Sequence, residues 1–213
     1  MLKPSKSKVL NFFMFYGWSI IIFSLVAFAG LTLIVSRINR INDNQRFSIF
    51  FCAYGLKEER YKNELYEELK EDGVLQVNYF DYLLDDSKIV TYYTSYGERS
   101  DINIMSEKDV KDMQEVIAEH YIPLTNDLLT ELGLDAKYAR YAYENTEYGI
   151  KIYDKEDISY NSSFSYQEWI NFSNDKGDTD SFYILIRKNS VNFGKSTTFG
   201  IKGLRYLIDE NTK

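Results

Sequence analysis

FSIFFCAY, residues 47–54, is an almost continuous apolar run without a charged residue. Runs of this kind form strands that are buried on both faces, and such strands are typical of parallel sheets covered by helices. Gly55 ends the run, and residues 56–72 then show the apolar spacing of an amphipathic helix. Gly73 stands where a helix C-terminus favours glycine. The folded part of the chain is therefore predicted to begin with a strand followed by a helix.

Downstream of this unit, strand and helix patterns continue to alternate. Strand patterns recur at residues 74–79, 101–105, 148–153 and 182–186, and helical patterns at about 88–96, 106–119, 123–133 and 198–208. Ser106 and Asp109 match an N-cap residue followed by an acidic residue at the third helical position. This order predicts an α/β fold with a mostly parallel sheet flanked by helices.

Upstream, residues 9–36 form an uncharged and largely apolar segment. A helix that crosses a bilayer needs about 20 such residues, so the length predicts an uncleaved membrane anchor. The alternative is a cleaved signal peptide, because three lysines precede the segment and Ala27-Phe28-Ala29 has the small-x-small pattern of a cleavage site. The apolar stretch continues beyond that pattern, which favours the anchor.

The predicted organisation is a cytoplasmic N-terminus (1–8), a transmembrane anchor (9–36), a linker (37–46) and an extracytoplasmic domain (47–213). Basic residues flank both ends of the anchor, and the free N-terminus adds positive charge to the first side. The first flank is also too short to form a domain. We therefore expect a single-pass protein of the cell membrane with its C-terminal domain outside the cytoplasm.

Charge and rare residues exclude several functions. The whole chain carries −7 and residues 1–46 carry +5, so residues 47–213 carry −12. An acidic domain repels phosphate backbones, so no nucleic-acid partner is expected. The single cysteine, Cys52, excludes an internal disulfide and a cysteine-based zinc site, and the single histidine, His120, leaves little scope for histidine-dependent catalysis.

Three weaker motifs favour neither a cofactor nor a metal. Residues 194–197 read Gly-Lys-Ser-Thr, like the end of a phosphate-binding loop, but Asn189 stands where that loop needs a glycine. Residues 174–180 hold three carboxylates without the spacing of a calcium-binding EF-hand loop. His120 falls in the last turn of a predicted helix, where a cation favours the helix dipole. We expect no enzyme activity; no carboxylate pair stands out that would support a hydrolase.

Aromatic residues are abundant, with 19 tyrosines and 14 phenylalanines. A composition rich in Lys, Asn, Ile, Tyr and Phe accounts for the total, but not for the positions. Several tyrosines lie at or after the ends of predicted strands, namely Tyr54, Tyr82, Tyr92, Tyr93 and Tyr96. Ligands of open parallel sheets bind at the carboxyl ends of the strands, and aromatic faces stack on sugars or line ligand clefts.

The order of these segments resembles the extracellular solute-binding proteins of bacterial ABC importers. The likeness rests on residues 53–55, 77–82, 95–102, 148–150 and 184–190. It implies an α/β lobe, an ABC permease as partner and a small polar solute, such as a sugar, as ligand. In that family, ligand contacts come from strand-end loops, and the matching positions are Tyr54, Gly55, Tyr82, Tyr96 and Tyr148.

One departure from the family leaves two hypotheses. Only about 30 residues separate the strand at 148–153 from the strand at 182–186, too few for a second full lobe. A single lobe cannot enclose a ligand between two walls. The chain is expected to be either a tethered receptor or accessory subunit for a small polar solute, or a lobe retained only for contacts with a membrane or envelope protein.

Overall fold

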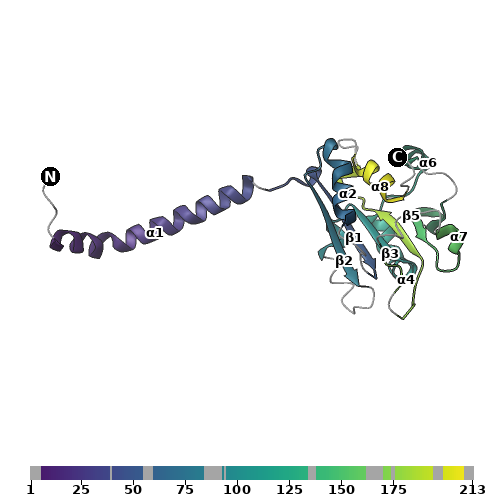
Figure 1. The fold of residues 1–213 in the computed structure, drawn as a ribbon, viewed down its shortest axis with the longest axis horizontal. Helices are drawn as coiled ribbons and strands as arrows, with labels where there is room; N and C mark the ends of the chain where they lie inside the picture. Colours follow the sequence, from purple (N-terminus) through teal and green to yellow (C-terminus); the bar gives the residue numbers. More distant parts are fainter. Residues whose placement is uncertain are drawn as a thin grey trace. The chain divides into compact units, whose positions relative to one another are not determined.

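The computed structural model describes residues 6–38, 40–54, 60–83, 93, 95–133, 138–161, 170–173, 176–193 and 199–208. The chain divides into two compact units, Met1–Ile41 and Asn42–Lys213. Figure 1 shows the long helix of the first unit and the sheet of the second.

The first unit consists of one helix, α1 (Lys6–Ile38), which contains the whole of the predicted segment 9–36. Its part Met14–Arg37 is long and apolar enough to cross a membrane, and none of it is buried by other parts of the structure. The hydroxyls of Thr32 and Ser36 donate to carbonyls one turn earlier, so these polar groups are satisfied within the helix. Length and composition alone do not distinguish such a helix from a signal sequence near the N-terminus.

The second unit is built on one six-stranded sheet with the order β2-β1-β3-β6-β5-β4. In chain order the strands are β1 (Arg46–Ala53), β2 (Gln76–Leu83), β3 (Ile102–Ser106), β4 (Arg140–Tyr143), β5 (Thr146–Tyr153) and β6 (Phe182–Ile186). Strand β1 pairs in parallel with β2 and β3, whereas the pairs β3–β6, β6–β5 and β5–β4 are antiparallel. The sheet is therefore mixed.

The α/β class is as predicted, but the mostly parallel sheet is found only in the half formed by β2, β1 and β3. Strand β6 returns through the sheet in the opposite direction. Strands β4 and β5 form a hairpin, of which β4 was not predicted. The hairpin turn at Glu144 and Asn145 has positive φ angles at both residues, which suits the right-handed twist of a two-residue hairpin loop.

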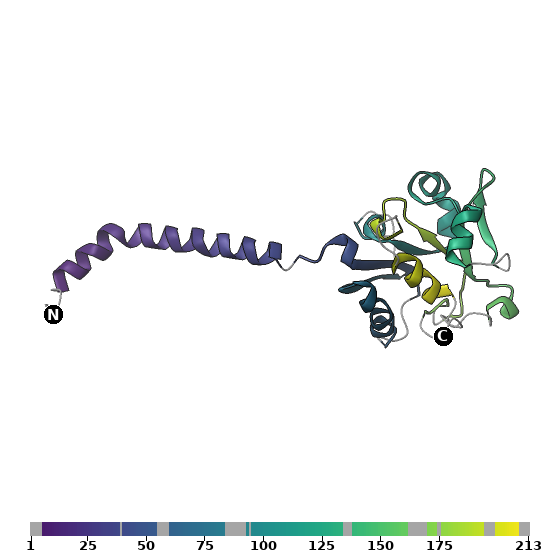
Figure 2. The ribbon, with the colours of Figure 1, turned by 90° about the horizontal axis from the view of Figure 1, so that it is seen from above.

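Strand β1 is buried on both faces, as its apolar run predicted. Phe47, Ile49 and Phe51 lie in one core cluster, and Phe50 and Cys52 lie in a second on the opposite face. The first cluster includes residues of α2 (Arg60–Leu69), α6 (Asn126–Leu132) and α8 (Phe199–Ile208), and the second includes residues of α4 (Glu107–Asp112) and α5 (Gln114–His120). Helices therefore cover both faces of the sheet (Figures 1 and 2).

The helix predicted at 106–119 is two helices. Met113 lies between α4 and α5 with φ −112° and ψ 21°, outside the helical region. No glycine or proline marks this break in the sequence. The predicted cap is confirmed, because the Asp109 amide donates to the Ser106 hydroxyl over 3.1 Å. The helix predicted at about 88–96 and the motif at 194–197 lie mostly or wholly outside the described residues.

The amino edge of the sheet, where β1 and β3 begin, is held by a buried carboxylate. Asp101 accepts hydrogen bonds from the Ser48 amide (2.7 Å), the Ser190 hydroxyl (2.5 Å) and the Asn192 side-chain amide (2.9 Å). These partners join β1 and the segment after β6 to the start of β3. Burial raises the pKa of Asp101 to about 6, although all three hydrogen bonds act in the opposite direction.

Arg187 is buried beside this edge, with 3% of its surface exposed. Its guanidinium donates to the Tyr93 hydroxyl (3.0 Å) and lies over the ring of Tyr121, 5.0 Å from the ring centroid. The Tyr121 hydroxyl accepts from Asn103 (2.6 Å) and lies 2.9 Å from that of Tyr93. Neutral hydroxyls and an aromatic face thus surround this cation.

Candidate functional site

The connections of β1 create a reversal of strand order at the centre of the parallel half. The chain leaves β1 for β2 on one side and then crosses to β3 on the other side of β1. Helix α2 after β1 and helix α4 after β3 lie against opposite faces of the sheet. In open α/β sheets, ligands bind outside the carboxyl ends of the strands at such a reversal.

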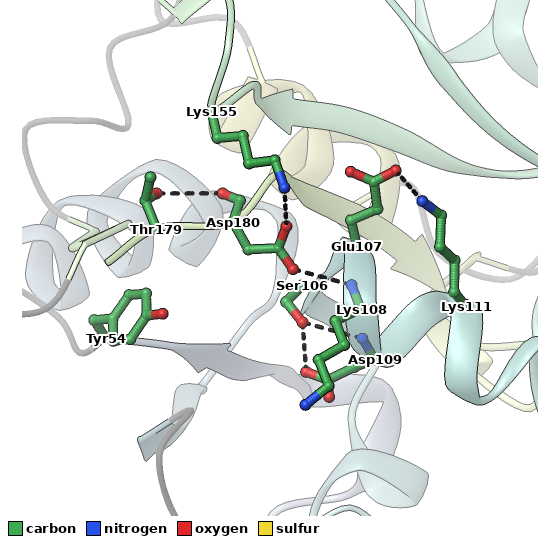
Figure 3. A pocket seen from close by; sticks show the side chains of 9 residues that line it. All are labelled: Tyr54, Ser106, Glu107, Lys108, Asp109, Lys111, Lys155, Thr179 and Asp180. Carbon is green, nitrogen blue, oxygen red and sulfur yellow. Dashed lines mark hydrogen bonds and ion pairs between the residues drawn. The ribbon is translucent and has the colours of Figure 1, made fainter. Parts of the chain in front are cut away.

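A cavity of about 540 Å³ lies at the carboxyl ends of β1 and β3, called the carboxyl edge below (Figure 3). Its volume is within the range of about 300–1,000 Å³ that is usual for small-molecule sites. The lining comes from the end of β1, from the β3–α4 junction, and from residues after β5 and before β6: Tyr54, Ser106, Glu107, Lys108, Asp109, Lys111, Lys155, Thr179 and Asp180. The last two residues reach this edge because β6 is antiparallel to β3 and starts where β3 ends.

The backbone amides at the start of α4 already have partners within the protein. The Glu107 amide donates to the Ser181 carbonyl (2.7 Å), the Lys108 amide to the Asp180 carboxylate (3.0 Å) and the Asp109 amide to the Ser106 hydroxyl (3.1 Å). An external anion would have to displace these groups in order to reach the amides. The end of this short helix is therefore not a ready anion site.

Two charge pairs line the cavity. Lys111 lies 2.6 Å from the Glu107 carboxylate, and Lys155 lies 3.6 Å from the Asp180 carboxylate. The second carboxylate also accepts from the Ser181 amide over 2.8 Å. These four side chains are therefore largely neutralised by one another (Figure 3).

Asp109 lies deeper, at the base of the first turn of α4. One of its oxygens accepts from the Ser106 hydroxyl (2.7 Å) and from the thiol of the buried Cys52 (3.4 Å). Burial raises the pKa of Asp109, and these two hydrogen bonds compensate only in part. The Asp109 carboxylate is thus partly buried, and its other oxygen has no hydrogen-bond donor among the described residues.

Tyr54 supplies the aromatic part of the lining, as expected from its place at the end of β1. Its ring packs edge-on against Phe182, with 6.4 Å between ring centroids. Its backbone amide donates to the Asn171 carbonyl (3.0 Å), which fixes the end of the strand. Figure 3 shows the Tyr54 hydroxyl directed toward the β3–α4 junction.

Two of the other predicted positions, Tyr96 and Tyr148, lie away from this cavity. Tyr96 precedes β3 and stacks on Phe80 of β2, with 5.0 Å between ring centroids. Tyr148 lies in the amino half of β5, where its side chain is part of the second core cluster and only 7% exposed. Gly55 and Tyr92 lie outside the described residues, and Tyr82 belongs to β2 without a described side chain.

Most of the charged lining had no signal in the sequence. Ser106 and Asp109 were recognised only as a helix cap, and the loop with Asp180 only as a weak calcium candidate. Lys108 and Lys111 on α4 and Lys155 after β5 were not singled out, because α4 and the segment after β5 are far apart in the chain. Asp180 joins them only because β6 is antiparallel to β3.

The side chains of the site offer hydrogen bonds and ion pairs. The Ser106 hydroxyl is bonded to a carboxylate, and His120 pairs with Glu119 (3.7 Å) at the far end of α5. Among the described residues, no group of three or more His, Cys, Asp or Glu side chains is arranged to hold a metal ion. The cavity is suited to binding a small polar molecule.

Comparison with known proteins gives no relative: no family model, curated protein or solved structure matches this chain.

Proposed function

We propose that the chain is a membrane-tethered receptor or accessory subunit that binds a small polar solute in the cavity at the carboxyl edge. The observation that carries the proposal is the position of this cavity at the strand-order reversal between β1 and β3. Its lining of one tyrosine, two short hydroxyl side chains and six charged residues suits a polar ligand.

In this proposal α1 is an uncleaved anchor, with the N-terminus inside the cell and the domain outside. The length and composition of α1 support the anchor, and the single buried cysteine suits an oxidising face. The partner is a membrane transport protein, such as an ABC permease, in keeping with the resemblance to solute-binding proteins. The domain binds the solute without transforming it.

A second candidate function is contact with a protein partner alone. One observation favours it: in the described part of the chain, every residue that lines the cavity belongs to the sheet, its connecting segments or helix α4, all within the second unit. A site formed by one lobe leaves much of a small ligand in water. In this case a partner surface would occupy the edge.

A thermal-unfolding screen of the full-length chain in detergent micelles separates the two functions. The panel contains sugars, oligosaccharides, polyamines, free amino acids and calcium. A ligand at 100 times its Kd adds about 2.7 kcal/mol to the free energy of unfolding. For a domain of this size, the increase corresponds to roughly 5–10 °C in Tm.

A receptor gives such a shift with one class of solute, and Tyr54→Ala abolishes it. Tyr96→Ala is the matched control, because it removes an aromatic side chain that does not line the cavity. A shift that survives Tyr54→Ala would place the ligand elsewhere. Absence of any shift over the panel would favour the contact function.

A further inference from the structure

The three lysines of the cavity are not equivalent. Lys111 and Lys155 each have a carboxylate partner, at 2.6 and 3.6 Å. The ammonium of Lys108 makes no ion pair or hydrogen bond with any of the residues that the structure describes; only the backbone amide of Lys108 is bonded, to Asp180. Lys108 is exposed, so its ammonium is open to a ligand.

The carboxylates of the cavity differ in the same way. Glu107 and Asp180 are committed to lysines. Asp109 uses one oxygen for Ser106 and Cys52, and its other oxygen accepts no hydrogen bond within the described parts of the chain. The charge of Lys108 acts on Asp109 from nearby, but the two side chains form no ion pair with each other. One cationic and one anionic side chain, on adjacent residues of one helical turn, therefore have no ion-pair partner among the described residues.

We propose that the solute is a small zwitterion, such as a free α-amino acid, whose carboxylate binds Lys108 and whose ammonium binds Asp109. This inference rests on the proposed receptor function and narrows it to one class of solute. In an α-amino acid the ammonium and the carboxylate are attached to the same carbon atom. This short separation matches two adjacent residues of opposite charge. Its side chain would extend toward Tyr54 (Figure 3).

Other classes of solute fit these groups less well. A phosphate would compete with Asp180 and Ser106 for the amides of α4. A polyamine needs several unpaired carboxylates, and Lys108 would repel it. A neutral sugar needs many side chains that can form hydrogen bonds with its hydroxyls. Four charged side chains of the cavity instead pair with one another, Glu107 with Lys111 and Lys155 with Asp180.

Isothermal titration of the full-length chain in detergent micelles tests the assignment. The probes are the twenty L-α-amino acids, each tested alone, with glucose, maltose and inorganic phosphate as other classes. The best amino acid is then compared with its N-acetyl derivative, which lacks the ammonium, and with its methyl ester, which lacks the carboxylate. Each derivative is expected to bind about ten- to a hundredfold more weakly, since each has lost one charged hydrogen bond.

Variants connect each charge of the solute to its residue. Lys108→Met should lower the affinity for the amino acid by about ten- to a hundredfold and leave the affinity for the methyl ester unchanged. Asp109→Asn should weaken the amino acid but not the N-acetyl derivative; asparagine keeps an oxygen for the Ser106 hydroxyl. The matched controls Lys188→Met and Asp112→Asn alter exposed charges outside the cavity and should leave the affinity unchanged.

The remaining outcomes separate this inference from the receptor function. Binding of glucose or maltose that is lost in Tyr54→Ala but kept in Lys108→Met would overturn the assignment of a zwitterionic solute and retain the receptor function. Amino-acid binding that is indifferent to both Lys108→Met and Asp109→Asn would overturn the assigned residues. No binding of any probe, with no thermal shift over the wider panel, would overturn both proposals.

Discussion

The two edges of the sheet use buried or half-buried carboxylates in opposite ways. At the amino edge, both oxygens of Asp101 accept hydrogen bonds, and its three donors come from distant parts of the chain. At the carboxyl edge, Asp109 uses one oxygen only, and Lys108 beside it has no partner among the described residues. The carboxylate at the amino edge therefore has donors on both oxygens, whereas the carboxylate at the carboxyl edge is incompletely paired.

This difference separates a structural cluster from a candidate binding site. A buried carboxylate that has all its partners holds segments together, and removing it leaves several donors unpaired. A carboxylate and an ammonium that face a cavity without an ion-pair partner among the described residues contribute little to folding but can bind a solute. Variants at the amino edge should therefore lower stability, and variants at the carboxyl edge should lower affinity.

The largest effect is expected for Asp101→Ala. The substitution leaves the Ser48 amide and the Ser190 hydroxyl without this acceptor, whereas the Asn192 side chain keeps the Arg46 carbonyl at 2.7 Å. We expect the free energy of unfolding to fall by about 3–5 kcal/mol. Urea unfolding of the full-length chain in micelles, followed by near-ultraviolet circular dichroism of the tyrosines, measures the loss. Asp109→Ala should cost only about 1 kcal/mol, mostly through the helix cap, and equal losses would remove the contrast between the edges.

The pH dependence of stability should come next in size. The pKa of Asp101 is about 6 in the folded protein against 3.8 for the free group, so between these values the folded protein holds a proton that the unfolded chain has lost. The free energy of unfolding therefore falls as the pH rises through this range, by about 3 kcal/mol from this group.

Urea unfolding at pH 4 and pH 7, in the original chain and in Asp101→Asn, isolates this contribution because other groups cancel in the difference. The original chain should gain up to about 3 kcal/mol relative to the variant on going from pH 7 to pH 4. A difference that does not change with pH would mean that Asp101 ionises normally and that its burial is incomplete.

A smaller loss is expected for Gly200→Ala, at the start of α8. A Cβ atom at this position would lie 2.1 Å from the Asn192 carbonyl oxygen, which is backbone and cannot rotate away. We expect a loss of about 1–3 kcal/mol, because α8 must move away from the segment that carries Asn192. In Gly203→Ala the nearest neighbour is the Phe47 ring, at 2.8 Å, which can adjust by rotation. A smaller loss in Gly203→Ala, measured in the same unfolding experiment, would agree with this distinction.

The smallest change in stability is expected for Lys108→Met. The side chain is exposed and makes no ion pair with described residues, so the free energy of unfolding should change by less than about 0.5 kcal/mol. Lys111→Met breaks the pair with Glu107 at the surface and should cost only slightly more, because solvent screens an exposed ion pair. A loss of several kcal/mol in Lys108→Met would show that this lysine has a structural partner and is not open to a ligand.

The sequence predicted the elements whose signals are local. The strand β6 was placed at residues 182–186, as observed, because a short apolar run has clear ends. The cap at Ser106 and the left-handed glycines Gly73 and Gly133 were readable from residue type and position. The run at 47–54 correctly indicated a strand buried on both faces.

The candidate site was predictable only in part, because its assembly depends on strand direction. Tyr54 follows β1 directly, and its position at the carboxyl edge needs no further information. Thr179 and Asp180 reach the same edge only because β6 is antiparallel, which the pattern of alternating strands and helices did not indicate. Tyr96 was predicted to lie at the carboxyl end of a strand, although it precedes β3 and so lies near the amino end of that strand.

Hydrogen–deuterium exchange of the full-length chain in micelles tests the contrast between the two edges most directly. Exchange is compared without solute, with a mixture of the L-α-amino acids, and separately with a mixture of glucose and maltose. The account predicts slow exchange at residues 101–103 and 187–192 in all samples, and new protection at residues 106–111 and 179–181 when the bound solute is present. Protection that appears at the amino edge instead, or at neither edge with any mixture, would contradict a solute site at the carboxyl ends of β1 and β3.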